Sequence, residues 1–168
     1  RLAHHALRGE VWEKALRYCR QAGTRAFDRA AFHEAVAAFD QALQALTHLP
    51  EHDNTGARAI DLRLDLDLPL NQLGAYGRRL ALLGEAEALA RGLDDRARLG
   101  RVLARMTQVR WITGDPDGAM AAGRQALALA VELGDSALQA RASHNLGQVY
   151  SAISDFGRAA ELLRLNVE

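Results

Sequence analysis

Similar amphipathic segments recur along this chain at an interval of about forty residues. Four of them begin at Ala31, Ala75, Asp115 and Asp155, and their equivalent positions 35, 79, 119 and 159 are spaced by 44, 40 and 40 residues. A further echo begins at Val11, half a period before the first segment. A repeat of this length is typical of stacked units that bury their apolar faces against their neighbours. The half-period echo indicates that each unit is a pair of similar helices.

The composition favours helices for these units. Apolar residues make up 49% of the 168 residues but aromatic residues only 5%, and alanine and leucine supply most of the apolar surface. Both residues are strong helix formers, whereas the β-branched and aromatic residues that favour strands are scarce. The sequence therefore predicts an all-α fold with a core of ordinary domain size.

Helix start and stop signals divide the repeats into individual helices. Gly114 is suited to the end of a helix, Asp115 to capping the next, and Pro116 to its first turn. Gly134 and Asp135 repeat the same signal, whereas the joint between Asp28 and Ala31 lacks both glycine and proline. With short connections that make neighbours antiparallel, we predict about nine helices, at residues 1–8, 11–28, 31–48, 55–73, 75–91, 95–113, 116–133, 136–153 and 155–167.

One segment shows a conflicting pattern. Leucines alternate strictly with other residues from Leu62 to Leu70, which is the periodicity of a strand, and Pro69 is a poor residue for a helix interior. The repeat register places a helix there, and leucine is itself a helix former. We therefore predict a helix that kinks or ends early near Pro69.

The spacing of small and aromatic residues resembles the tetratricopeptide repeat. The fourth repeat is the most similar, with Leu146-Gly147 and Tyr150 on its first helix and Asp155-Phe156 and Ala159 on its second. The resemblance implies a right-handed α-solenoid of antiparallel helix pairs whose glycines and alanines let the helices approach closely. It covers nearly the whole chain and suggests one domain over residues 1–168, with a leading half-repeat at 1–10 and repeats at 11–50, 54–92, 95–134 and 135–168.

The second repeat departs from the family pattern. Arg79 stands where the tetratricopeptide repeat has a small residue, so that helix pair is expected to splay or to shift its register by one residue. The period also exceeds the usual value of about 34 residues. Such long repeats are similar to those in the C-terminal regions of bacterial adenylate and guanylate cyclases and of regulatory ATPases, which implies a fragment of a larger signalling protein.

Charge and cysteine content narrow the possible partners. The 21 basic and 21 acidic residues cancel, which is unlike the basic excess with which nucleic-acid-binding proteins neutralise phosphates. Cys19 is the one cysteine, which is consistent with a reducing, cytoplasmic environment. No apolar run reaches the length of a membrane span. We therefore expect a cytoplasmic protein that binds neither nucleic acid nor membrane.

No residue pattern points to catalysis or to a cofactor. The chain lacks the Walker and Rossmann glycine motifs and the serine elbow motif. The acidic and histidine clusters lack the spacing of zinc or calcium sites, so we expect no metal. Most candidate chemical groups are more simply read as surface or packing residues; these are His4, His5, His33, Asp61, Asp65, Asp67, Cys19 and Trp12. Trp111 is either a ligand platform or a packing residue.

The first helix of each pair is expected to line the concave side of the stack. The repeat register assigns ten polar or aromatic residues to a binding groove: Arg20, Thr24, Arg101, Arg105, Gln108, Trp111, Arg141, His144, Asn145 and Gln148. Arg17, Gln21, Asp28, Asp61 and Asp65 map to the same side. Guanidinium groups suit carboxylates and side-chain amides suit a peptide backbone. The groove is predicted to bind an acidic or C-terminal peptide; alternatively, these residues are only the solvated face of a scaffold.

The functional prediction is a non-catalytic interaction module of a multidomain bacterial signalling protein. The alternative is a sensor that binds a small molecule or signalling peptide and controls an attached cyclase or ATPase domain. A self-sufficient enzyme is disfavoured because no acid, base and nucleophile set converges. We also expect end-to-end association of the isolated fragment through the uncovered leucines of its last helix, Leu162, Leu163 and Leu165, and through Val167.

Overall fold

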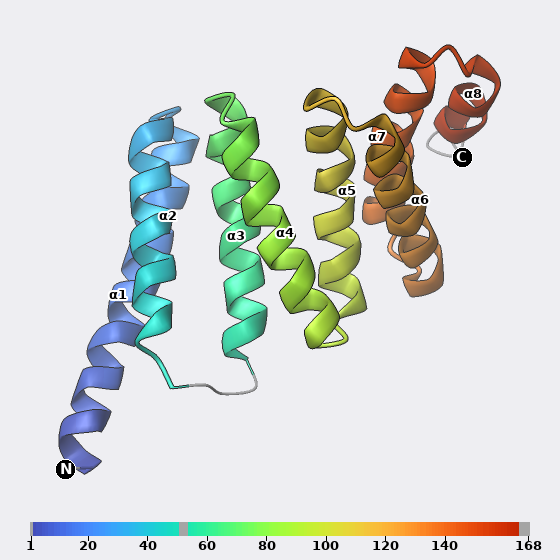
Figure 1. The fold of residues 1–168 in the computed structure, drawn as a ribbon. Coiled ribbons are helices and arrows are strands. Elements are labelled where there is room, and N and C mark those ends of the chain that lie inside the picture. The colour runs from blue at the N-terminus through green and yellow to red at the C-terminus, as the bar shows by residue number, and fades with distance from the viewer. Residues whose placement is uncertain (1, 51–53, 165–168) are drawn as a thin grey trace. The chain divides into compact units, whose positions relative to one another are not determined.

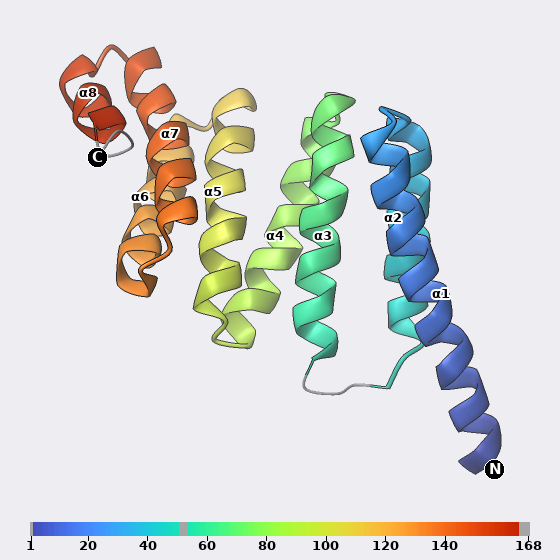
Figure 2. The same cartoon turned by 180° about the vertical axis from the view of Figure 1, so that it is seen from behind.

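The computed structural model describes residues 2–50 and 54–164, with side chains from Val11 onward except that of Leu163. These residues form eight α-helices and no strand (Figures 1 and 2). The helices are α1 (Leu2–Asp28), α2 (Phe32–Thr47), α3 (Thr55–Gln72), α4 (Tyr76–Gly92), α5 (Arg96–Ile112), α6 (Pro116–Leu133), α7 (Ser136–Ala152) and α8 (Phe156–Arg164). They fall into two compact units, residues 1–82 and 83–168, which are described separately.

The predicted helices are confirmed within the described residues with one correction, and the predicted end of the last helix, at residue 167, lies outside these residues. The break expected between residues 8 and 11 is wrong, because α1 runs without interruption from Leu2 to Asp28, which gives eight helices instead of nine. A single glycine in a helix costs only about 1 kcal/mol, so Gly9 does not end α1. The helix predicted at residues 55–73 is confirmed in spite of the strand periodicity from Leu62 to Leu70: α3 continues through the buried Pro69 and ends three residues later, at Gln72.

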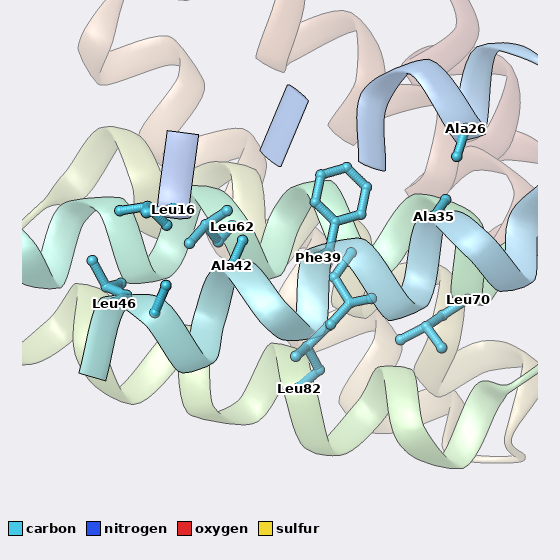
Figure 3. Packing of buried hydrophobic residues seen from close by; sticks show 11 residues of the cluster. Leu16, Ala26, Ala35, Phe39, Ala42, Leu46, Leu62, Leu70 and Leu82 are labelled. Carbon is cyan, nitrogen blue, oxygen red and sulfur yellow. The ribbon is translucent and has the colours of Figure 1, made fainter. Parts of the chain in front are cut away.

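The core of the first unit lies where α1, α2 and α3 meet (Figure 3). Phe39 and Ala42 of α2 pack among Leu16 of α1 and Leu62 of α3, and each is at most 3% exposed. The Phe39 ring lies directly against Gly23 of α1, because a Cβ atom there would be 2.8 Å from Phe39 Cε1. The glycine therefore makes room for the aromatic ring between the two helices.

The second unit solves the same packing problem with the residue sizes exchanged. The positions equivalent to Gly23 and Phe39 are Thr107 of α5 and Gly123 of α6. A Cβ atom on Gly123 would lie 3.2 Å from Thr107 Cγ2 and 2.8 Å from Leu146 Cδ1 of α7. The glycine now stands on the second helix of the pair instead of the first. The close approach of the helices is kept although the residue that permits it has moved.

Burial confirms the register of the repeat. The equivalent residues Ala35, Arg79, Ala119 and Ala159 are 0%, 1%, 0% and 3% exposed. The facing positions on the first helices, which are Gly23, Asp67, Thr107 and Gly147, are buried as well. The predicted shift of register at Arg79 is therefore wrong, since this arginine occupies the same buried position as the alanines.

Arg79 is accommodated by an acidic partner at the facing position. Its Nε donates to Asp67 Oδ1 at 2.7 Å, its Nη2 to Asp67 Oδ2 at 3.3 Å, and its Nη1 to Asn71 Oδ1. Both charged side chains are only 2% exposed. A buried charge is tolerated when it is paired and hydrogen-bonded. The second repeat thus replaces two small residues by one matched ion pair between α3 and α4.

Removing one partner of this pair should be far more damaging than removing both. We expect Arg79→Ala to lower the free energy of unfolding by about 3–5 kcal/mol, because Asp67 would remain buried without its counter-ion. Asp67→Gly with Arg79→Ala restores the residues found in the first and fourth repeats and should be less destabilised than the two single losses combined. Urea denaturation of the wild type, Asp67→Gly, Arg79→Ala and the double variant measures the coupling energy between the two residues. Losses of unfolding free energy that simply add would contradict this prediction.

The turns inside the helix pairs share one backbone conformation. Ala30, Gly74, Gly114 and Ser154 are equivalent in the repeat, and all four have positive φ, between 58° and 85°. At the first turn the ring centroids of Phe27, which precedes Ala30 in the sequence, and Phe32, which follows it, lie 5.7 Å apart. The joint between Asp28 and Ala31, which has no glycine, therefore forms the same turn as the other three. Here Ala30 adopts the left-handed conformation, which its Cβ atom disfavours.

Ala30→Gly should stabilise the protein. The left-handed conformation costs a residue with a Cβ atom about 1–2 kcal/mol, and part of this gain is lost to the greater freedom of glycine in the unfolded chain. We expect a net increase of about 0.5–1 kcal/mol in the free energy of unfolding. Gly114→Ala is the matched control and should destabilise by a similar amount. Equal stabilities of the wild type and Ala30→Gly would show that this turn is not strained.

Candidate functional site

A pocket opens between the first helices of two successive pairs, α1 and α3, within the first unit. Its volume is about 440 Å³, and the residues that line it are Glu13, Leu16, Arg17, Arg20, Gln21 and Thr24 of α1 with Arg58 and Leu62 of α3. Leu16 and Leu62 are 3% and 1% exposed and form an apolar floor, whereas the polar side chains form the rim. Two buried leucines and six polar or charged residues thus line one concave surface. Polar groups that converge beside an apolar surface are typical of ligand sites.

Two ion pairs join α1 to α3 beside this pocket. Arg58 donates from Nη2 to Glu13 Oε1 at 2.6 Å and from Nη1 to Glu13 Oε2 at 3.0 Å, and Arg20 Nε donates to Asp65 Oδ2 at 2.8 Å. Partners are 45 residues apart in both pairs, with the signs of the charges reversed. Residues seven apart share a helix face, so both pairs lie along the same line of contact.

The Glu13–Arg58 pair lowers the pKa of Glu13. Hydrogen bonds from Arg58 hold the pKa of Glu13 below its usual value, against the opposing effect of partial burial, and the charges of Arg58 and Arg17 act in the same direction as the hydrogen bonds. Glu13 therefore remains a carboxylate at and below neutral pH. Its negative charge is matched by Arg58 within the rim.

Three further rim residues add donors and acceptors on α1. The Arg17 guanidinium lies 5.5 Å from the ring centroid of Tyr18, and Thr24 Oγ1 donates to the backbone oxygen of Arg20 at 3.1 Å. The Arg17, Gln21 and Thr24 side chains are all exposed. This part of the rim presents a guanidinium, an amide and a hydroxyl group, which can bind a carboxylate and a peptide backbone.

The structure divides the ten predicted groove residues between the two units. Arg20 and Thr24 line the α1–α3 pocket, as do Arg17 and Gln21 from the wider set. The other eight lie on α5 and α7 in the second unit: Arg101, Arg105, Gln108 and Trp111 on α5, and Arg141, His144, Asn145 and Gln148 on α7. Asp28 is exposed at the end of α1 and is not among the residues lining this pocket.

The residues on α5 and α7 contribute partly to packing. Asn145 Nδ2 donates to the backbone oxygen of Ala104 at 2.7 Å, so this amide ties α7 to α5. His144 Nε2 and Gln148 Nε2 are 3.1 Å apart along one face of α7. Arg101, Arg141, His144 and Gln148 are exposed, whereas the others are half-buried. The two helices thus bring arginine, histidine and amide groups to neighbouring positions.

Sequence reasoning missed four of the pocket residues, Glu13, Leu16, Arg58 and Leu62. A signal for the two charged ones was present, because Glu13 and Arg20 are spaced like Arg58 and Asp65, with opposite signs. Using it requires knowing that α1 and α3 are neighbours. Leu62 belongs to the alternating leucines, whose pattern gave no indication that one of them forms a pocket floor.

Two other residues that the sequence analysis considered as chemical groups, Trp12 and Cys19, make contacts between helices. Trp12 packs between α1 and α2 as predicted, with its ring stacked on His48 at 4.1 Å between centroids. Cys19 is half-buried, and its thiol donates to Gln41 Oε1 at 3.8 Å. The side chains of His4 and His5 lie outside the described residues. Within residues 11–50 and 54–164, no three histidine, cysteine or acidic side chains are placed to hold a metal ion. None of the described helices is long and apolar enough to cross a bilayer.

Comparison with proteins of known structure identifies the type of fold. No protein-family model and no curated protein matches the chain. The Rap conjugation gene regulator of the plasmid pLS20, solved in complex with the Phr* peptide, is similar over 90% of this chain and 41% of its own, at 17% identity and a TM-score of 0.75. MamA is similar over 90% of this chain and 76% of its own, at 12% identity and a TM-score of 0.65.

A Rap protein solved in complex with the Competence and Sporulation Factor is similar over 91% of this chain and 53% of its own, at 14% identity and a TM-score of 0.58. The chain has a tetratricopeptide-like helical-repeat fold. This confirms the all-α fold class, and at such low identity it shows the fold alone. The chain spans less than half the length of the pLS20 Rap protein.

The Glu13–Arg58 pair predicts a small dependence of stability on pH. The pKa of Glu13 is lower in the folded than in the unfolded state, so its contribution is present above the unfolded-state pKa and is lost as pH falls through the folded-state pKa. Glu13 is half-exposed, which limits the contribution to at most about 1 kcal/mol. Glu13→Gln should therefore lose stability at pH 7, and its difference from the wild type should shrink as the pH is lowered through the acid range in urea denaturation. A constant difference across this range would contradict it.

Proposed function

We propose that this chain is a non-catalytic interaction module that binds a peptide or protein segment along the exposed face of its first helices. The α1–α3 pocket is the observation on which the proposal depends, because it combines an apolar floor with a rim of guanidinium, amide and hydroxyl groups. Its volume of about 440 Å³ is within the range of small-ligand sites, about 300–1,000 Å³. It has room for one or two side chains of an extended peptide.

The rim and floor indicate how such a peptide would be held. An aliphatic side chain of the peptide would cover Leu16 and Leu62. A carboxylate next to it would bind Arg17 or Arg20, since guanidinium–carboxylate bonds are strong and directional. Gln21 can both donate to and accept from the peptide backbone. This arrangement favours an acidic or C-terminal segment.

The structural neighbours support this proposal. Two of the similar structures, both Rap proteins, were solved in complexes, one with the Phr* peptide and the other with the Competence and Sporulation Factor. The shared fold means that this chain has helices arranged to offer a comparable face. The cluster on α5 and α7 is proposed as a second contact region, with Arg105 and Arg141 as its principal cations.

We further propose a cytoplasmic, regulatory role within a larger bacterial signalling protein. The pLS20 Rap protein is a gene regulator, and this chain spans 41% of its length, which is consistent with a binding module that works together with other segments. The second candidate is a sensor in which the bound peptide controls an attached cyclase or ATPase domain. Reading the coding sequence on both sides of these 168 residues tests it, since a catalytic domain there would favour the sensor. End-to-end association of the fragment remains a proposal; Leu165 and Val167, and the side chain of Leu163, lie outside the described residues.

A peptide screen tests the proposed function. We expect a random library of nonapeptides to yield binders that contain an aliphatic residue next to an acidic one. Arg17→Ala should weaken the strongest binder about 10- to 100-fold, which corresponds to the loss of one charge-assisted hydrogen bond. Fluorescence anisotropy with the labelled peptide measures the dissociation constant.

Matched variants separate the possible sites. Arg25→Ala removes the same charge from an exposed residue of α1 that does not line this pocket, and it should leave binding unchanged. Arg105→Ala and Arg141→Ala report on the second region. If no library peptide binds, or if Arg17→Ala and Arg25→Ala bind the peptide equally well, the α1–α3 pocket is not the binding site.

A further inference from the structure

We propose that Asp65 is a built-in competitor for the ligand of the α1–α3 pocket, and that an acidic peptide binds by taking Arg20 away from it. This inference rests on the proposed function and adds how the site selects its ligand. It concerns one class of ligand, an extended peptide that carries a carboxylate beside an aliphatic side chain. A peptide without a carboxylate has nothing to exchange with Asp65.

The two ion pairs beside the pocket differ in the way that such an exchange requires. Arg58 binds Glu13 end-on, with Nη1 and Nη2 each donating to a different carboxylate oxygen. Arg20 binds Asp65 through Nε alone, at 2.8 Å. A guanidinium group has five N–H donors, so a single bond through Nε is the more easily replaced arrangement. The Glu13–Arg58 pair is suited to holding α1 against α3, and the Arg20–Asp65 pair to exchange.

Because the Arg20–Asp65 pair is partly exposed, replacing Asp65 by a ligand carboxylate requires little free energy. The Arg20 side chain is 46% exposed and that of Asp65 is 31% exposed, so water reaches both before and after the ligand binds. Exposed ion pairs change an equilibrium constant by about fivefold at most. A ligand carboxylate that also contacts Arg17 gains more than this, because it meets two guanidinium groups instead of one.

The charges around the pocket show what Asp65 does in the absence of a ligand. The lining holds three arginines, Arg17, Arg20 and Arg58, against the single acid Glu13, which is an excess of two positive charges. Asp65 offsets part of this excess from just outside the lining. The pocket therefore offers its full positive charge only to a group that can replace Asp65, which disfavours neutral peptides.

Removal of the competitor should strengthen binding of acidic peptides only. The probes are the strongest nonapeptide from the screen and its analogue in which every Asp and Glu is replaced by Asn and Gln and the C-terminus is amidated, both labelled at the N-terminus with an uncharged fluorophore. At 0.15 M salt, Asp65→Asn should bind the acidic peptide about three- to fivefold more tightly than the wild type does. Its affinity for the neutral analogue should be unchanged. Asp28→Asn, which removes an exposed acid of α1, controls for the change in net charge.

A second measurement uses the wild-type protein and so does not depend on the folding of a variant. The Arg20 ¹⁵Nε–¹Hε signal reports on the bond to Asp65, and it should shift when the acidic peptide is titrated in but not with the neutral analogue. If the acidic peptide binds and Arg17→Ala weakens it, but Asp65→Asn does not tighten it and the Arg20 signal does not move, this inference is wrong and the proposed function stands. If no library peptide binds the wild type, the proposed function itself fails, and the competitor role with it.

Discussion

The close approach of the two helices in each pair is the constraint on which the rest of the structure depends. It requires that the bulk at two buried positions, one on each helix, be matched. The first repeat meets this with Gly23 under the Phe39 ring, and the third with Gly123 beside Thr107. The second meets a related requirement with charge, because Asp67 and Arg79 occupy positions that are small elsewhere. Each pair thus brings its helices together with a different combination of facing side chains.

This constraint also determines which residues are available for binding. Once one face of a first helix is committed to its partner, the positions between the buried ones are directed elsewhere. On α1, Leu16 and Gly23 are buried, whereas Arg17, Arg20 and Gln21 are exposed at the pocket rim. The same alternation on α7 leaves Arg141 and His144 exposed next to the buried Ala142 and Ser143. The polar face of these two helices is therefore a consequence of the packing register.

Local signals in the sequence were enough for the helices and turns but not for the pairs that join them. Caps such as Asp115, whose side chain accepts from Gly118 N, are read from adjacent residues, so the boundaries of α5 to α7 were predicted within one residue. The partner of Arg79 stands twelve residues earlier, and that of Glu13 stands 45 residues later. Nothing local identifies such partners. Arg79 is a visible departure from the family pattern, but its compensation by Asp67 is apparent only in the folded structure, and the same is true of the pocket floor.

Helix α3 shows how burial alone assigns different roles to the same chemistry. Asp65 and Asp67 are two residues apart and each binds an arginine through Nε, at 2.8 Å and 2.7 Å. Asp67 is 2% exposed, so breaking its pair would leave a charge without solvent, and the bond acts as part of the core. Asp65 is 31% exposed and its arginine 46%, so that bond can be exchanged at little cost. A helix that directs one aspartate inward and the other towards a pocket can therefore keep its fold while its second ion pair opens to a ligand.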